Sequence, residues 1–235
     1  MSYYKEYNYR GYLMYAYQDA TGWHYETVES PEGSGRYPGQ YTSIALDADG
    51  YPHISYYHDS DKELKYARQD ASGWHIETAD TNGSVGKHSS LRLDSEGYPH
   101  ISYFHSSNND LLYVHKDGTG WHRETVESEG SVGSFTSLEL DDAGHPHISY
   151  RDFGKKILKY ANKDAGGWHI QAVDEAGDVG EYTSLALDSE GCPHISYYDA
   201  GNDALKYAVC EETGPTPTPT RHIRRAYLPL TVARS

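Results

Sequence analysis

Short runs in which apolar and polar residues alternate follow one another along most of the chain. Such alternation is typical of β-strands with one buried face. In one stretch it predicts four strands, which cover residues 42–47, 53–58, 63–69 and 74–79. Ile44 and Leu46 share a face of the first strand, and Ile54 and Tyr56 share a face of the second. The stretch therefore predicts a small antiparallel sheet.

Tight turns join these strands in pairs. Residues 47–50 and 70–73 have the Asp and Gly composition of hairpin turns. The connection after the fourth strand is longer and ends with Gly-Ser-Val-Gly at residues 83–86. We expect this longer segment to cross to the first strand of the next sheet.

The whole four-strand unit repeats. The motif Pro-His-Ile-Ser-Tyr begins at Pro52, Pro99, Pro146 and Pro193, so each copy starts 47 residues after the previous one. Repeats of four short antiparallel strands build the blades of a β-propeller. A β-solenoid also stacks repeats, but its coils are usually shorter and rarely contain two tight hairpins. We therefore predict an all-β fold, a β-propeller of four-stranded antiparallel blades.

The repeat divides the chain into about five blades, of which the first and the last are incomplete. Complete units cover residues 41–87, 88–134 and 135–181, and partial units cover residues 1–40 and 182–212. The first unit lacks its inner strand and the last lacks its outer strand. A five-bladed ring and an N-terminally truncated fragment of a longer array both fit this organisation.

Two segments follow the repeats. Residues 213–221 are rich in alternating Pro and Thr, which favours an extended, polyproline-like linker. Residues 222–235 form a C-terminal tail with a short apolar patch next to arginines. The tail is either a sorting or attachment signal, or a disordered remnant or edge strand.

Composition restricts the class of function. Only 37% of the chain is hydrophobic and tyrosine supplies 24 residues, so the core must be aromatic and amphipathic. A formal net charge of −15 repels a phosphate backbone, so we expect no nucleic-acid partner. We expect no membrane span, because no apolar stretch is long enough, and the first residues lack the apolar core of a signal peptide.

The only two cysteines, Cys192 and Cys210, lie in the last repeat. In a hairpin centred near Gly201, residues whose numbers sum to about 402 face each other, and 192 plus 210 is 402. We predict a disulfide that staples the incomplete last blade. A disulfide indicates an oxidising compartment, and hence an extracellular or cell-surface location. Two half-buried free thiols are the alternative.

Histidine recurs at one position of the repeat, as His53, His100, His147 and His194. A ring of imidazoles can bind a metal, but a residue present in every blade is explained more simply by a shared hydrogen bond. The acidic turns, such as residues 47–50, resemble fragments of a calcium loop but lack its further ligands. We therefore expect no metal site and no cofactor.

Residues that break the repeat are the natural candidates for catalysis. Arg151, Asp152 and Lys155 disturb the third complete unit, but no paired carboxylates, activated nucleophile or phosphate loop accompanies them. Among 35 acidic residues, two carboxylates at a glycosidase spacing arise by chance. We therefore expect that the protein is not an enzyme.

Aromatic and hydrogen-bonding residues occur together where the second and third strands of a repeat connect. The candidate ligand-binding residues are Tyr57, His58, Phe104, His105, Tyr198 and Asp199. An aromatic platform with polar neighbours suits sugar recognition, and several weak sites on one rigid scaffold gain avidity. The alternative is that these residues only pack against the repeat.

The chain resembles a known kind of repeat protein. The runs Ser-Leu-Ala-Leu-Asp-Ser-Glu-Gly at 184–191 and Pro-His-Ile-Ser-Tyr-Tyr-Asp at 193–199 resemble tandem repeats of uncharacterised exported bacterial and archaeal proteins. The Pro-Thr linker and the Tyr-Leu-Pro-Leu tail resemble the C-termini of bacterial surface proteins. The repeat resemblance covers residues 2–210 and implies a propeller and export, but no established activity.

These observations predict an extracellular binding module that recognises carbohydrate through repeated loop sites. A protein-interaction or structural surface scaffold is the first alternative, so the expected partners are glycans or a surface protein. A glycan-processing, sialidase-like hydrolase is the second, although the chain lacks the Ser-x-Asp-x-Gly-x-Thr-Trp box of sialidase propellers. We expect a monomer unless open blade edges pair.

Overall fold

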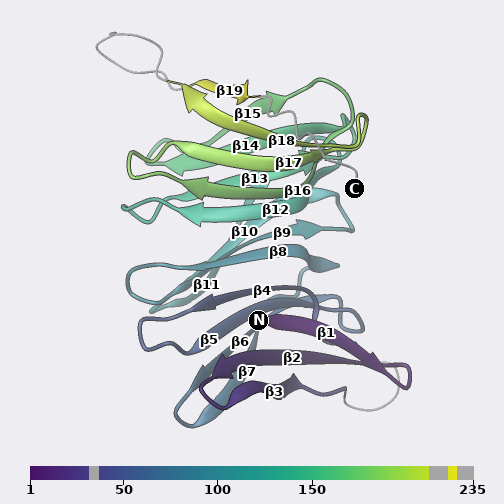
Figure 1. Cartoon of the computed structure of the whole chain (residues 1–235), viewed down its shortest axis with the longest axis vertical. Helices are drawn as coiled ribbons and strands as arrows, with labels where there is room; N and C mark the ends of the chain where they lie inside the picture. The colour runs from purple at the N-terminus through teal and green to yellow at the C-terminus, as the bar shows by residue number, and fades with distance from the viewer. Residues whose placement is uncertain (32–36, 212–221, 227–235) are drawn as a thin grey trace. The chain divides into compact units, whose positions relative to one another are not determined.

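The computed structural model describes residues 1–31, 37–211 and 222–226. Every regular element among them is a β-strand, and the strands form five antiparallel sheets (Figure 1). The chain divides into two compact units, residues 1–129 and residues 130–235. The predicted all-β class is therefore confirmed. The described residues contain no helix that could cross a membrane.

The first unit contains three sheets. The first sheet has three strands, β1 (Ser2–Tyr7), β2 (Arg10–Asp19) and β3 (Gly22–Glu29). The second has four, β4 (Gln40–Leu46), β5 (Pro52–His58), β6 (Glu63–Asp70) and β7 (Gly73–Asp80). The third has β8 (Val85–Leu93), β9 (Pro99–His105), β10 (Asp110–Asp117) and β11 (Gly120–Glu127). Each strand pairs with its neighbour in sequence, as the predicted hairpins require.

The second unit contains two four-stranded sheets. One is formed by β12 (Val132–Leu140), β13 (Pro146–Asp152), β14 (Ile157–Asp164) and β15 (Gly167–Asp174). The other is formed by β16 (Val179–Leu187), β17 (Pro193–Asp199), β18 (Ala204–Glu211) and β19 (His222–Ala226). Strand β19 comes from the segment that the sequence assigned to the tail, and it fills the outer place of the last sheet. The Pro-Thr linker of residues 213–221 lies outside the described residues.

Neighbouring sheets bury aromatic side chains against each other. Trp74 of the second sheet packs edge-on against Tyr15 of the first, with ring centroids 5.6 Å apart, and its indole N–H donates to Glu26 at 2.9 Å. Trp121 of the third sheet packs against Tyr66 of the second in the same way. These two tryptophans, which lie 47 residues apart, thus supply the contact to the preceding sheet.

A second recurring contact is a buried hydrogen bond from a tyrosine to an acid of the preceding sheet. The hydroxyl of Tyr103 on β9 donates to Asp80 at the end of β7 at 2.6 Å. In the second unit, the hydroxyl of Tyr197 on β17 donates to Asp174 at the end of β15 at 2.8 Å. Both tyrosines are almost completely buried. The hydroxyl groups of this tyrosine-rich core therefore have acceptors.

Glycines bring backbones together at the same boundaries. Gly86 has a φ of 108°, and a Cβ added to it would lie 2.9 Å from the Cα of Leu64. In the second unit, a Cβ on Gly180 would lie 3.0 Å from the Cα of Leu158. In both units, the start of an inner strand therefore packs directly against the third strand of the sheet before it in that unit.

Removing one boundary hydroxyl tests how much this hydrogen bond stabilises the fold. We expect Tyr103→Phe to lower the free energy of unfolding by about 1–3 kcal/mol, because it leaves the buried Asp80 carboxylate without that donor. Urea denaturation measures the change. Tyr25→Phe, at a tyrosine that is 64% exposed, is the matched control and should have little effect. Equal stability of both variants would contradict the role of the bond.

Candidate functional site

The recurring histidines make hydrogen bonds within their own sheets. Nδ1 of His53 on β5 is hydrogen-bonded to the hydroxyl of Tyr66 on β6, and Nε2 lies 3.4 Å from a carboxylate oxygen of Asp47. Burial is the main cause that lowers the pKa of His53. A neutral ring can accept the tyrosine proton at Nδ1 and donate its Nε2–H to the aspartate.

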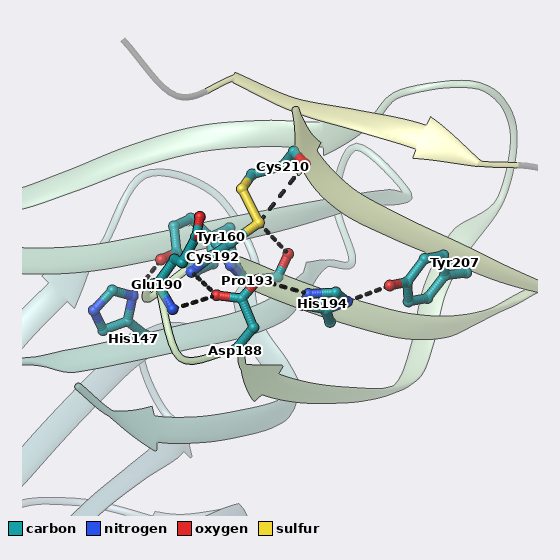
Figure 2. Close-up of a disulfide and its surroundings, with 9 residues drawn as sticks. All are labelled: His147, Tyr160, Asp188, Glu190, Cys192, Pro193, His194, Tyr207 and Cys210. Carbon is teal, nitrogen blue, oxygen red and sulfur yellow. Dashed lines mark hydrogen bonds and ion pairs between the residues drawn. A yellow bond between two sulfur atoms is a disulfide. The ribbon is translucent and has the colours of Figure 1, made fainter. Parts of the chain in front are cut away.

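The same Asp-His-Tyr arrangement occurs in the other repeats. His100, His147 and His194 bond Tyr113, Tyr160 and Tyr207 through Nδ1. Figure 2 shows His194 between Tyr207 and Asp188. The shared hydrogen bond expected from the sequence is therefore present in each of these sheets, and it holds the turn after the inner strand against the third strand.

Cys192 and Cys210 form the predicted disulfide, with their Cα atoms 5.8 Å apart (Figure 2). In the β17–β18 hairpin His194 faces Val209, so opposite residues sum to 403 and the two cysteines lie one step off direct opposition. Cys192 also lies near Asp188 and His194, with potential ligand atoms within 4.8 Å of one another. Its sulfur is in the disulfide, however, so this group has no thiolate to offer a metal.

The structure places the six predicted ligand-binding residues at the ends of second strands, and several of them are buried. Tyr57, His58, His105 and Asp199 are each at most 4% exposed. Asp199 accepts hydrogen bonds from Asn202 and pairs with Lys206 at 2.5 Å. These four side chains therefore do not form the open platform that we expected from the sequence. The strands continue through these positions, so their side chains pack inside the sheets.

Phe104 and Tyr198 are the two predicted residues that stay partly exposed. Both lie on second strands and face the first strand of their own sheet, Phe104 opposite Lys87 and Tyr198 opposite Glu181. The hydroxyl of Tyr198 donates to Asp203 at 2.7 Å. These two residues therefore lie beside an irregularity in the first strand of their own sheet.

A β-bulge interrupts each inner strand near its beginning. Between the pairs Gln40–Tyr57 and Ser43–Ser55, strand β4 has one more residue than β5. The bulge contains Tyr41, whose φ of 53° is in the left-handed region. A bulge redirects a side chain, and a non-glycine residue in this conformation costs about 1–3 kcal/mol.

The same left-handed bulge recurs with an aromatic ring in every repeat. His88, Phe135 and Tyr182 have φ angles of 54°, 55° and 50°, and each follows the previous bulge residue by 47 positions. Tyr41 is 42% exposed and Tyr182 is 71% exposed. Glycine would occupy this conformation without strain, so the retention of rings points to a task for the ring itself.

In the first unit, the bulge rings form one cluster. The rings of Tyr41 and His88 are 4.7 Å apart, Tyr41 lies edge-on to Tyr57 at 6.3 Å, and His88 lies edge-on to Phe104 at 6.3 Å. The ammonium of Lys87 lies 5.3 Å from the centre of the Tyr57 ring. Burial, with the nearby charge of Lys87, lowers the pKa of His88 to about 4. The cluster therefore presents neutral aromatic faces and one cation.

In the second unit, the bulge rings stand beside an ion-pair network. Phe135 and Tyr182 have ring centroids 4.7 Å apart. Arg151, which is 2% exposed, pairs with Glu181 and Asp178, and its guanidinium lies over Phe153 at 5.2 Å. Arg151, one of the repeat-breaking residues of the sequence, therefore belongs to the surroundings of the bulge.

The buried aspartate next to this network is Asp152. One of its carboxylate oxygens accepts the backbone N–H of Lys155 at 2.9 Å, and the other has no hydrogen-bond partner among the described residues. The side chain is 1% exposed, so it does not reach a ligand on the surface. Asp152 therefore supports the turn after β13.

The bulge residues were missed in the sequence, although a signal was present. The four bulge residues are all aromatic, lie at the repeat spacing, and follow by two positions a glycine near the start of the inner strand: Tyr41, His88, Phe135 and Tyr182. Strict alternation of apolar and polar residues leaves no place for an extra residue in a strand, so it did not indicate the bulge. An aromatic residue two positions after a repeated glycine would have marked the site.

Comparisons with known proteins define the fold class. A scan against protein-family models finds no match, and a search of the curated proteins finds none. Solved structures do resemble the chain. A protein of unknown function from Dyadobacter fermentans aligns with a TM-score of 0.60 at 10% identity, covering 88% of this chain and 66% of the other.

Two glycoside hydrolases of family GH43 are also similar. A β-1,3-galactosidase with galactodeoxynojirimycin has a TM-score of 0.53 at 10% identity, covering 95% of this chain and 92% of the other. The exo-β-1,3-galactanase from Phanerochaete chrysosporium has a TM-score of 0.50 at 11% identity, covering 88% and 52%. These two neighbours are five-bladed β-propellers. The likeness confirms that this chain has a β-propeller fold; it spans about two thirds of the Dyadobacter protein and about half of the galactanase.

Buried neutral histidines make stability depend on pH. Burial lowers the pKa of His53, His100 and His147 below the ordinary 6.5. Below pH 6.5 the unfolded chain protonates these histidines, whereas the folded chain keeps them neutral. Their contribution to the free energy of unfolding is therefore complete above pH 6.5 and is lost as the pH falls through the folded pKa values. We expect the urea midpoint to fall between about pH 7 and pH 5. His147→Gln should weaken the dependence, and a midpoint that rises on acidification would contradict it.

The disulfide makes a chemical prediction. The denatured, unreduced protein should show no reactive thiol, because both cysteines are bonded. Replacing Cys192 and Cys210 by serine should lower the free energy of unfolding by about 2–4 kcal/mol, since the bridge closes a short loop of the unfolded chain. Thiol titration and urea denaturation measure these effects. Two thiols that react before reduction would show that the bridge is absent.

Proposed function

We propose that this protein is an extracellular, carbohydrate-binding propeller without hydrolytic activity, and that its ligands stack on the bulge aromatics. The observation that carries the proposal is the aromatic ring held at a left-handed backbone position in four repeats, with Tyr41 and Tyr182 exposed. Tyr182 is 71% exposed, so burial against the fold does not explain its retention. Aromatic rings with polar neighbours are common in small-molecule sites.

The polar surroundings of the rings fit this chemistry. In the first unit the Tyr57 hydroxyl lies 3.1 Å from the Ser84 hydroxyl, which also accepts a hydrogen bond from Ser106 at 2.8 Å. In the second unit Glu181 and Asp178 lie beside Tyr182 in sequence and in the network of Arg151. Hydroxyl and carboxylate groups next to an aromatic face can bind the hydroxyl groups of a sugar while its ring stacks.

The carboxyl groups whose pKa the fold perturbs are held ionised, which suits hydrogen bonding to sugar hydroxyl groups. In the part of the chain that the structure describes, every carboxyl group with a resolved pKa shift is shifted downward, as for Asp178 through its hydrogen bond from Lys156. A glycosidase needs a carboxylic acid whose pKa is raised so that it can protonate the leaving group. The propeller neighbours are glycosidases, but their activity does not carry over at about 10% identity.

Two further points concern location and the alternative function. The disulfide is the observation that favours an extracellular location, because such bonds persist in oxidising compartments. A protein-binding scaffold remains the alternative function, since stacked aromatic residues also dominate protein interfaces.

A substitution at the bulge separates binding from folding. Tyr182→Gly should relieve the left-handed strain, so the thermal midpoint should stay equal or rise, while affinity for the best ligand of a glycan array should fall at least about tenfold. Calorimetry and thermal denaturation measure the two effects. Tyr25→Ala, which removes an exposed ring from β3, is the control and should keep the affinity. Silence across the array, or turnover of a glycan, would contradict the proposed function.

A further inference from the structure

The residue just before each bulge aromatic differs in every repeat. These residues are Gln40, Lys87, Ser134 and Glu181, an amide, an ammonium, a hydroxyl and a carboxylate. Each faces the end of the second strand of its own sheet. The bulge residue is thus aromatic in each of these repeats, while the residue before it differs in chemistry. Such differences can give repeated sites different specificities.

Lys87 is the cation of this series, and its surroundings are neutral. Its ammonium lies over the Tyr57 ring, at 5.3 Å from the ring centre, and it forms no ion pair with any described residue. The adjacent His88 ring is uncharged at neutral pH, because burial lowers its pKa to about 4. In a chain with a net charge of −15, a half-buried lysine without a carboxylate partner stands out.

The equivalent position of the second unit shows the opposite arrangement. Glu181 replaces the lysine there. Arg151, on the second strand of the preceding sheet, supplies its counter-charge. In the first unit, Tyr57 occupies the place of that arginine, 94 residues earlier, and its ring offers no charge to Lys87. The charge at the variable position is therefore neutralised inside the second unit and left available inside the first.

We propose that Lys87 makes the first-unit cluster specific for acidic sugars, those that carry a carboxylate or a sulfate. The sugar ring stacks on the Tyr41 and His88 side of the cluster while its anionic group accepts hydrogen bonds from the Lys87 ammonium. This inference rests on the proposed carbohydrate-binding function and names its ligand class. A charged hydrogen bond in such partly buried surroundings is stronger than one in water.

The test uses the full-length protein on an array in which each uronate- or sulfate-bearing oligosaccharide has a neutral partner of the same linkage. We expect acidic members to bind at least about tenfold better than their neutral partners, with a preference that weakens in high salt. Lys87→Gln should remove the preference and keep neutral binding, and Lys87→Arg should retain part of it. Lys5→Gln, the same charge change at an exposed residue of β1, is the matched control.

The outcomes are distinguishable. Equal binding of acidic and neutral members, or a preference that survives Lys87→Gln, would overturn the role of Lys87 while leaving the carbohydrate-binding function intact. If no member of the array binds, both the role of Lys87 and the carbohydrate-binding function would be overturned. Tighter binding of poly-glutamate than of any acidic oligosaccharide would assign Lys87 to an acidic protein partner and would also overturn the inference.

Discussion

The boundary between adjacent sheets is the constraint on which the rest of the structure depends. The core is built from tyrosines, and a buried hydroxyl must find an acceptor. The preceding sheet supplies that acceptor, as Asp80 does for Tyr103 and Asp174 does for Tyr197. Trp121 packs against Tyr66 at the same boundary as Tyr103, and Trp74 packs against Tyr15 at the boundary before it. A chain with few aliphatic residues therefore still has a packed interior, because buried tyrosine hydroxyls find acceptors and aromatic rings pack against each other at these boundaries.

Much of the fold could be predicted from the sequence because it is set by local chemistry repeated at a constant spacing. Alternation identified the strands, and the Asp-Gly turns identified the hairpins. The recurring histidine was correctly assigned to a hydrogen bond, and Cys192 and Cys210 to a disulfide. Strand β19 was anticipated only as one alternative, an edge strand in the tail, because the tail shares neither motif nor spacing with the outer strands of the other sheets.

The candidate site was harder to predict, for a physical reason. Sequence reasoning placed it at the ends of the second strands, where Tyr57 and His58 prove to be buried. The exposed rings lie one strand inward, at a bulge that breaks the alternation and holds Tyr41 and Tyr182 in a conformation that aromatic residues disfavour. An aromatic residue at a left-handed position contradicts both its backbone propensity and the alternation of the strand, so neither can predict it. This contradiction distinguishes the site from the rest of the fold.

The close approach of Gly86 to Leu64, and of Gly180 to Leu158, also bears on how such a chain can evolve. Each repeat carries one half of a boundary at its start and the matching half at its end. Gene duplication or loss of a whole 47-residue unit therefore rejoins compatible surfaces, whereas a shorter insertion separates a glycine from its leucine. The residue before the bulge takes no part in the glycine–leucine packing, although Lys87 and Glu181 contact side chains of the preceding sheet. Copies can consequently diverge there in ligand chemistry while they stay interchangeable as building blocks.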